Sequence, residues 1–390
     1  MSHSTILSSP LSFIGWDSGE KLTAEIQDRR PDKILIVVDP LLMKLGVVDR
    51  VIGYVQETGV PYDVYTDIIP EPALETADKL VAFAREGRYS LVVGIGGGSA
   101  LDLAKLAAVF VGNAGDVSEY LNLSGTKKLQ HKGIPKILIP TTSGTGSEVT
   151  DISVLALGQT KDVIAHPYLK ADLAIVDPRL TVSVPARVTA DTGADALTHA
   201  IEAYLSVNST LYSDAIAVQA IRLIGKALPQ AVRNGEDKEA RIAMSYGSYL
   251  AGVAFYNAGV GAVHALAYPL GGEFHIPHGA SNAVMLPYVL AFIRESCATR
   301  LQDILHLLKY VERSADEQEG AKNCVVEIAA LVKEIGIPTT LKDFGIPETA
   351  LRALAADGAR QKRLLSRCPM ELDEEAIYKI YSAAFYGKSL

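Results

Sequence analysis

Four residues in the second half of the sequence carry side chains that bind metal ions, namely Asp195, His199, His264 and His278. Asp195 and His199 are four residues apart, a spacing that places a carboxylate and an imidazole on one face of a helix. The two other histidines lie in a stretch, residues 263–279, that is almost free of charged side chains. One carboxylate and three imidazoles suit a divalent first-row metal such as iron or zinc. These residue types therefore predict a metal site and indicate an enzyme.

The alternative for these four residues is a set of polar side chains buried in a core, since a single buried histidine usually has a structural role. A shared helix face and two histidines in apolar surroundings favour the metal site instead. His275, three residues before His278, is a fifth candidate. We expect it to line a substrate pocket or to contact one of the ligands, and we take it as a catalytic candidate.

A glycine turn in the first half of the sequence is suited to binding phosphate. It follows a β-rich run at residues 91–94, precedes a helical pattern at 100–111, and consists of Gly96, Gly97, Gly98 and Ser99. Exposed N–H groups and the dipole at a helix N-terminus favour an anion there. The spacing matches neither the GxGxxG dinucleotide fingerprint nor a Walker loop. Taken alone, an ordinary tight turn explains it equally well.

Two other segments that follow predicted strands support a nucleotide site. Asp39 ends the run at residues 33–38, where an acid accepts from the ribose 2′-hydroxyl of NAD and repels the extra phosphate of NADP. The alternative is that Asp39 only starts a turn, as the first residue of an Asp-Pro pair. Residues 141–148 are rich in hydroxyl groups, and Thr141, Thr142 and Thr145 are candidate contacts to the cofactor. The alternative is that this segment is an ordinary polar loop. Ligands of open α/β sheets lie beyond the carboxyl ends of strands, so three such segments favour a nucleotide site.

The elements that must position these residues fall into two groups. Short β-rich runs alternate with helical patterns up to about residue 176; the runs are 33–38, 62–65, 91–94, 137–139 and 173–176, and the helical patterns 45–58, 74–86 and 100–111. Such alternation predicts a parallel sheet covered by helices on both faces. Beyond residue 179 only helical patterns follow, at 189–205, 211–233, 238–255, 325–335 and 374–385. We therefore predict a Rossmann-like α/β domain over residues 1–183, an all-helical domain over residues 184–390, and a linker at 178–185.

Composition argues against several other classes of protein. A net charge of −8 and a pI of about 5.6 indicate that the protein does not bind nucleic acid. Three scattered cysteines without a CxxC pair predict reduced thiols in a cytoplasmic protein. Residues 242–272 contain no acidic residue, lysine or arginine and are long enough to span a bilayer. Their polar residues and glycines favour two helices buried in the protein, so we expect no membrane association.

Taken together, these motifs make the chain resemble the iron-containing alcohol dehydrogenase family, which includes lactaldehyde reductase and 1,3-propanediol dehydrogenase. The resemblance runs from about residue 13 to the C-terminus and is most specific in GGGSALDLAK (96–105), PTTSGTGSEVT (140–150), DALTH (195–199) and HALAYPLGGEFHIPHG (264–279). It implies an N-terminal dinucleotide-binding domain, an all-helical C-terminal domain, and cofactor and metal sites that meet in the cleft between them.

Carried over residue by residue, the resemblance implies the following roles. The family's metal ligands fall on Asp195, His199, His264 and His278. Its pyrophosphate turn falls on residues 96–99, with Asp102 one helical turn later, and its second cofactor loop falls on Thr141, Thr142 and Thr145. Lys161 matches a lysine that contacts the phosphate-ribose part of the cofactor, and Asp39 matches a residue associated with preference for NAD.

The sequence departs from the family four residues after His264. Many relatives have a second histidine there, proposed to assist proton transfer, whereas this chain has Tyr268. Tyrosine can relay a proton through its hydroxyl, but with a reference pKa of about 10 it is a weaker shuttle at neutral pH. Tyr268 is therefore our second catalytic candidate.

The resemblance implies an NAD(H)-linked alcohol dehydrogenase or aldehyde reductase that acts on a small primary alcohol or aldehyde. It also implies a divalent metal, with Fe²⁺ preferred and Zn²⁺ the alternative, and a homodimer. Two rivals belong to the same superfamily: a hydroxyacid–oxoacid transhydrogenase and an oxidoreductase similar to glycerol dehydrogenase. A third rival is a binding protein that senses NAD or metal without turnover.

Overall fold

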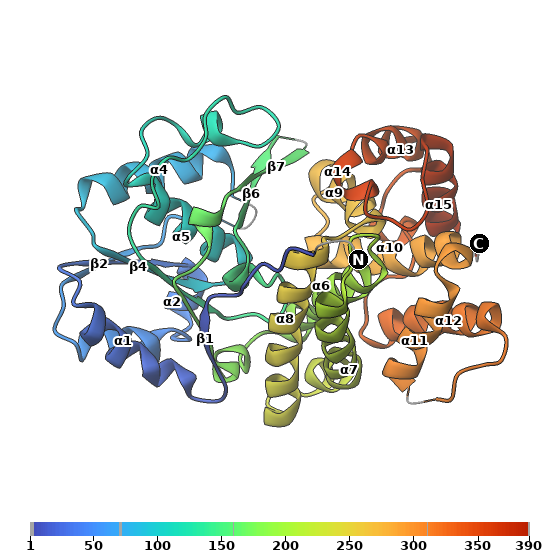
Figure 1. Cartoon of the computed structure of the whole chain (residues 1–390), viewed down its shortest axis with the longest axis horizontal. Helices are drawn as coiled ribbons and strands as arrows, with labels where there is room; N and C mark the ends of the chain where they lie inside the picture. Colours follow the sequence, from blue (N-terminus) through green and yellow to red (C-terminus); the bar gives the residue numbers. More distant parts are fainter. Residues whose placement is uncertain (1–3, 70–71, 159, 310, 389–390) are drawn as a thin grey trace. The chain divides into compact units, whose positions relative to one another are not determined.

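The chain forms two compact units in a computed structural model that describes residues 4–69, 72–158, 160–309 and 311–388 (Figure 1). The α/β unit comprises Ser8–Val184. The helical unit comprises Pro185–Leu390, joined by residues 4–7. Residues 4–7 are attached by Leu7, whose backbone N–H donates to Asn257 Oδ1 at 2.8 Å while the Asn257 amide donates back to the Leu7 carbonyl at 3.2 Å.

The α/β unit is built on a six-stranded sheet in which every pairing is parallel. Its strands are ordered β1 (Leu11–Ile14), β8 (Leu173–Val176), β5 (Lys136–Pro140), β4 (Leu91–Gly96), β2 (Ile34–Val38) and β3 (Tyr62–Tyr65). The helices between them are α1 (Lys21–Arg29), α2 (Pro40–Lys44), α3 (Asp49–Gln56), α4 (Leu74–Glu86) and α5 (Gly98–Phe110). The predicted fold class, a parallel α/β sheet followed by an all-helical region, is confirmed.

The sheet is buried on both faces because its central strands are apolar at nearly every position, with Lys136 of β5 as an exception. Leu35, Val37 and Val92 point to one face and pack with α4 and α5. Ile36 and Val93 point to the other face and pack with α1 and α3. This alternation within uninterrupted apolar runs is what a parallel sheet with two helical layers requires. Because β2, β4 and β5 run parallel, their carboxyl ends lie at one common edge of the sheet.

The helical unit contains no strand within its described residues. Its helices are α6 (Ala186–Leu205), α7 (Leu211–Arg233), α8 (Lys238–Ala258), α9 (Ala262–Phe274), α10 (His278–Ile293), α11 (Ala298–Lys309), α12 (Glu317–Glu334), α13 (Leu351–Ala359), α14 (Lys362–Leu365) and α15 (Glu374–Tyr386). They share one apolar core to which α6, α7 and α8 contribute long buried stripes.

The uncharged stretch at residues 242–272 lies in α8 and α9, which are mostly buried. In the described part of the chain, no helix is by itself long and apolar enough to cross a membrane. Only α8 and α9 taken together reach the required length and composition, and they are bent by 107° relative to each other.

Several predicted boundaries were wrong for local reasons. The helix predicted at 45–58 is the shorter α3, because the chain turns at Gly46, which adopts φ +69°, and the helix begins only at Asp49. The short helix α2, which precedes this turn, was not predicted. Helix α12 begins eight residues earlier than predicted, where the Asp316 carboxylate accepts from the N–H groups of Gln318 and Glu319 and caps it. Not predicted at all were edge strand β1 and an antiparallel hairpin, β6 (Ile152–Leu157) and β7 (Thr160–Ala165).

Candidate metal centre and cofactor site

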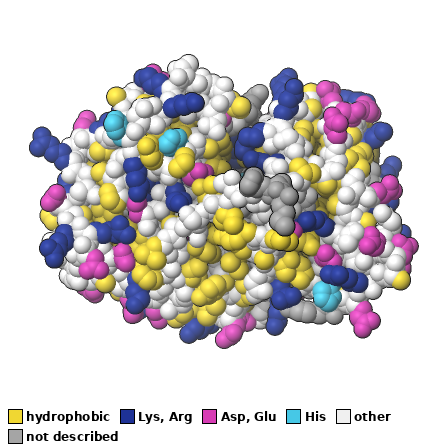
Figure 2. Space-filling model, in the orientation of Figure 1, with side chains coloured by type: hydrophobic (Ala, Val, Ile, Leu, Met, Phe, Trp, Pro, Cys, Tyr) yellow, Lys and Arg dark blue, Asp and Glu magenta, His cyan; other side chains and the backbone are white. Residues whose placement is uncertain are grey.

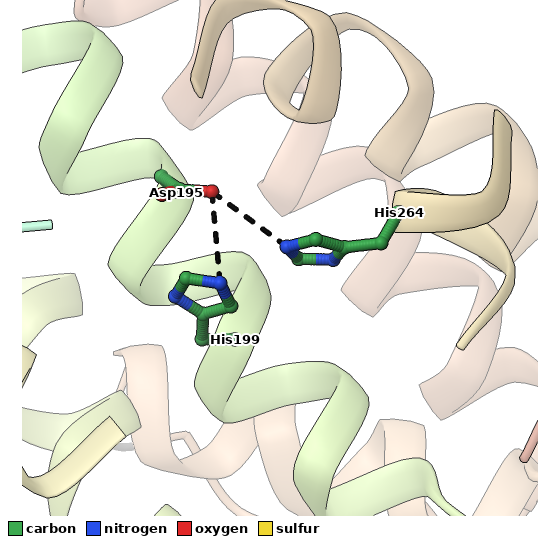
Figure 3. A group of neighbouring side chains, drawn as sticks. All are labelled: Asp195, His199 and His264. Atoms are coloured by element: carbon green, nitrogen blue, oxygen red, sulfur yellow. Dashed lines mark ion pairs between the residues drawn. The ribbon is translucent and has the colours of Figure 1, made fainter. Parts of the chain in front are cut away.

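The helical unit brings the four predicted metal ligands to one point. Asp195 and His199 come from α6, His264 from the first turn of α9, and His278 is the first residue of α10. The Nε2 atoms of His199, His264 and His278 lie 3.9, 3.8 and 3.7 Å from the same oxygen, Asp195 Oδ1. Figure 3 shows Asp195, His199 and His264, whose ligand-type atoms all lie within 4.8 Å of one another.

These positions follow from close backbone approaches and ring stacking. Gly279, beside His278, lies against the backbone of α6, where an added Cβ would be 1.9 Å from the carbonyl oxygen of Asp191. Only glycine permits α10 to start so close to α6. The His199 ring stacks on Phe255 at 4.4 Å and on His264 at 4.7 Å between centroids. The imidazoles are thereby fixed with their Nε2 atoms directed at Asp195.

The electrostatics of this cluster favour a cation. Asp195, His199 and His264 are 3%, 5% and 2% exposed, so water solvates none of them well. Burial raises the pKa of Asp195, but the neighbouring imidazoles and an amide N–H together lower it by more. The pKa is therefore below its usual value of 3.8. The carboxylate is therefore ionised at neutral pH. One ionised carboxylate and three imidazole nitrogens form a donor set that fits a divalent first-row metal.

Two residues at this centre were missed by the sequence analysis. Glu202 lies on α6 beside the ligands, and its Oε2 is hydrogen-bonded to Nδ1 of His264. Asn282, fully buried on α10, donates through Nδ2 to Asp195 Oδ1 at 2.7 Å. The side-chain oxygen of Asn282 is buried without a hydrogen-bond partner in the described structure. The spacing of Asp195, His199 and Glu202 at i, i+4 and i+7 was a visible signal, since it defines one helix stripe.

The α/β unit brings the glycine turn and the hydroxyl-rich loop together at the carboxyl edge of the sheet. Strand β4 runs into Gly97, the N-cap of α5, and the Thr141 N–H donates to the Gly96 carbonyl at 3.0 Å. A Cβ on Gly98 would lie 2.8 Å from Cγ2 of Thr145, so the two loops touch where only glycine fits. Neighbouring strands of a parallel sheet thus present one small, polar surface, the usual place for a dinucleotide phosphate.

The other predicted cofactor residues differ in their surroundings. Asp39 follows β2, the neighbour of β4, and its Oδ1 caps α2 by accepting from the Leu41 N–H at 2.7 Å. Both oxygens of Asp102 are used inside the protein: Oδ1 accepts from the buried Lys105 at 3.1 Å, and Oδ2 accepts from the Val154 N–H at 2.9 Å. Lys161 lies on β7, opposite Ala156 of the hairpin, and Ser99 lies in the first turn of α5.

Comparison with known proteins decides the family. The family described as "Iron-containing alcohol dehydrogenase" matches residues 10–178, and the C-terminal domain of the Fe-containing alcohol dehydrogenase family matches residues 189–385. The chain belongs to the iron-containing alcohol dehydrogenase family. It is 58% identical over 387 residues to "Long-chain-alcohol dehydrogenase 1" of Geobacillus thermodenitrificans (strain NG80-2), covering 99% of this chain and 98% of the relative.

Two further matches span most of the chain. The "NAD-dependent methanol dehydrogenase" of Bacillus methanolicus is 35% identical over 348 residues, 89% of this chain and 91% of that protein. A solved structure titled "Crystal structure analysis of 1,3-propanediol oxidoreductase" superimposes with a TM-score of 0.94 at 34% identity, covering 98% of this chain and 100% of the other. As a member of this family, the chain is an oxidoreductase of the alcohol dehydrogenase type.

Of the two catalytic candidates of this alcohol dehydrogenase, only Tyr268 lies beside the metal centre. Its ring is 5.8 Å from the His278 ring, measured between centroids. Burial raises the pKa of Tyr268 above its usual value of 10, so the hydroxyl is protonated at neutral pH. His275 instead ends α9 in the left-handed conformation, φ +54°, with an exposed side chain. Within the described residues, no hydrogen bond, ion pair or ring contact joins the His275 side chain to the four ligands.

Proposed function

We propose that this protein is an NAD(H)-linked alcohol dehydrogenase or aldehyde reductase, with a divalent metal held by Asp195, His199, His264 and His278. The observation that carries the proposal is the convergence of three imidazole Nε2 atoms, at 3.7–3.9 Å, on one buried carboxylate oxygen. Iron is our first choice because the family is named for it, and zinc is the alternative that the same donor set accepts.

A metal bound here supplies Lewis acidity toward the oxygen of the substrate. The protein's own residues must then keep water away and manage the proton. The apolar and aromatic surroundings, such as Phe255 against His199, exclude bulk water from three of the four ligands. Tyr268 is the candidate to pass the alcohol proton outward through its neutral hydroxyl. His275 is retained as a candidate only for contact with the substrate.

For the cofactor, we propose NAD with its pyrophosphate at Gly96–Ser99 and with Thr141, Thr142 and Thr145 alongside. The contact between Gly98 and Thr145 supports this arrangement, because it joins both loops into one surface. Asp39 would accept from the adenosine ribose, Lys161 would meet the phosphate-ribose part, and Asp102 would hold the turn from within. The B. methanolicus relative, described as NAD-dependent, supports the choice of NAD.

The substrate class is a primary alcohol or its aldehyde. The relatives named above act, by their names, on long-chain alcohols, on methanol and on 1,3-propanediol. From the sequence we expect a small alcohol, whereas the relative with 58% identity favours a longer chain. The two expectations differ in one measurable quantity, the dependence of kcat/KM on the number of carbon atoms.

We also propose that the protein is a homodimer that associates through an edge of the sheet. Strand β1 lies at that edge, and in the described structure β8 is its only strand partner. Leu11 on β1 is 60% exposed; Figure 2 shows some hydrophobic side chains where Figure 1 draws β1, and a denser group where it draws α8. An exposed edge strand that carries an apolar residue such as Leu11 is a template for a second chain. Size-exclusion chromatography with light scattering tests this, and a monomer at micromolar concentration would contradict it.

The function is tested on protein stripped of metal and reconstituted separately with Fe²⁺ or Zn²⁺. Oxidation of primary alcohols from methanol to hexadecanol, and reduction of the matching aldehydes, is followed by NADH absorbance. We expect turnover only with metal and with NAD(H). Turnover of hydroxy acid and oxo acid pairs with cofactor retained through purification would favour the transhydrogenase. Metal and NAD binding without any turnover would favour the sensing protein.

A further inference from the structure

Glu202 is a carboxylate beside the candidate metal centre that is not itself a candidate ligand. It is 5% exposed and lies on α6, three residues beyond His199. Its Oε1 accepts from the Val263 N–H at 2.6 Å, and its Oε2 is hydrogen-bonded to Nδ1 of His264. Both oxygens are therefore engaged by consecutive residues in the first turn of α9, where backbone N–H groups lack partners within the helix.

We propose that Glu202 is a positioning residue that holds His264 in the tautomer able to bind a metal through Nε2. The proposal rests on the proposed function, because it concerns a ligand of that metal site. A carboxylate accepts hydrogen bonds and does not donate them, so Nδ1 of His264 must carry the proton. The lone pair of the imidazole then lies on Nε2, which is the atom that faces Asp195.

The opposite side of the same ring supports this tautomer independently. Nδ2 of Asn282 lies 2.7 Å from Asp195 Oδ1, and an ionised carboxylate oxygen requires a donor at that distance. That amide nitrogen is also 3.2 Å from Nε2 of His264 and 3.3 Å from Nε2 of His278, and it has one further hydrogen for the two rings. A lone pair on Nε2 of His264 suits this donor, whereas a proton on that atom would point at it. Glu202 thus assigns the proton to Nδ1, and the Asn282 contact agrees with the lone pair on Nε2.

Glu202→Gln separates this role from simple packing, because it keeps the size of the side chain. The Gln oxygen can accept from the Val263 N–H, but its NH₂ group then faces Nδ1 of His264. That contact favours the tautomer with the proton on Nε2, which cannot bind metal without losing the proton. We expect metal affinity to fall roughly 10–100-fold, the range measured for hydrogen-bond partners of ligating histidines.

The test measures the dissociation constant for Zn²⁺ or Co²⁺ by competition with a chromophoric chelator. The matched control is Glu327→Gln, which removes one carboxylate from the same unit, where it pairs with Lys309 at 2.8 Å. Glu202→Asp retains the charge on a shorter stem and should recover part of the affinity. A Glu202→Gln variant that binds metal as tightly as the wild type and Glu327→Gln would overturn the proposal.

A second measurement, made on the wild type, tests the proposal even if the Glu202→Gln variant does not fold. In metal-free wild-type protein labelled with ¹⁵N-histidine, long-range ¹H–¹⁵N correlations report the tautomer of each ring, and His264→Gln assigns the resonance. We expect Nδ1–H for His264, and Nε2–H would refute the role of Glu202. If the wild type itself binds no metal, the proposed function fails, whereas a metal-binding wild type with an unaffected Glu202→Gln variant defeats only this inference.

Discussion

Removing one partner of the buried pair formed by Asp102 and Lys105 should strongly destabilise the α/β unit. Lys105 is fully buried on α5, and its Nζ donates to Asp102 Oδ1, to Ser147 Oγ at 2.7 Å and to the Ile152 carbonyl at 2.6 Å. Through these bonds the helix that carries the glycine turn is tied to the hydroxyl-rich loop and to β6. In the described structure, Asp102 is the only acidic side chain within ion-pair distance of Lys105.

Asp102→Asn is the perturbation that tests this. The amide of Asn cannot neutralise the ammonium group of Lys105. Its NH₂ group would also face a donor, either Lys105 Nζ or the Val154 N–H, since the carboxylate now accepts from both. Breaking a buried pair from one side costs about 3–5 kcal/mol, because the remaining charge is uncompensated. At a urea dependence of about 2 kcal/mol per molar, the unfolding midpoint of the α/β unit should fall by roughly 2 M.

The assay is urea unfolding followed by tryptophan fluorescence. The chain has a single tryptophan, Trp16, and it lies in the α/β unit, so its emission reports on that unit. The double variant Asp102→Asn, Lys105→Met should recover much of the loss, since it removes the uncompensated charge. A single-variant loss below about 1 kcal/mol, the range of exposed pairs, would refute the reasoning.

The same variants test whether Asp102 contributes to cofactor binding, and whether it does so directly or by holding the loops. If Asp102 acts by holding the turn and loop together, Lys105→Met should weaken NAD binding as well. If Asp102 contacts NAD itself, Asp102→Asn should weaken binding while Lys105→Met leaves it unchanged. Isothermal titration with NAD distinguishes the two outcomes.

Three further predictions concern single side chains. His264→Ala should lower metal affinity by roughly 100-fold or more while leaving the dissociation constant for NAD unchanged; full metal content in the purified variant would contradict the ligand assignment. Asp39→Gly should improve NADP binding roughly fivefold by removing about 1 kcal/mol of repulsion, and unchanged NADP kinetics would leave Asp39 only as the cap of α2. Burial raises the pKa of Glu148 to about 7 from 4.5, so the stability it contributes is present below pH 4.5 and is lost as pH rises to about 7. Glu148→Gln should therefore stabilise the α/β unit by on the order of 1–3 kcal/mol at pH 8 but little at pH 4.5, and urea midpoints that respond equally at both pH values would contradict this.

The sequence predicted what depends on local periodicity. Strand β3, helix α4 and helix α7 were predicted with the bounds that the structure shows, since each has a clean apolar pattern and polar flanks. Asp195 and His199 were recognisable as a pair because four residues make one helical turn. The hairpin β6–β7 was missed because its burial alternates only weakly and its flanks resemble the polar loop before it.

What the sequence could not predict depends on contacts between distant segments. His278 was predicted as a ligand, but the way it reaches Asp195 was not: Gly279 lets α10 lie against the backbone of α6, a contact between residues nearly ninety apart in the chain. Asn282 gave no signal, since an asparagine one turn after a histidine is common in any helix. Glu202 could have been found from its place on the α6 stripe, but its hydrogen bond to His264 depends on where α9 begins.

The buried polar groups of the candidate metal centre have partners within the protein itself. The buried carboxylate of Asp195 is compensated by the Asn282 N–H and by the surrounding imidazoles, which hold its pKa below the usual value. Glu202 is likewise satisfied by Val263 and His264. The helical unit also has an extensive apolar core of its own, unlike a zinc finger that is unfolded without its ion. Metal should therefore add stability only by binding the folded state, about 2.7 kcal/mol at a concentration one hundred times the dissociation constant.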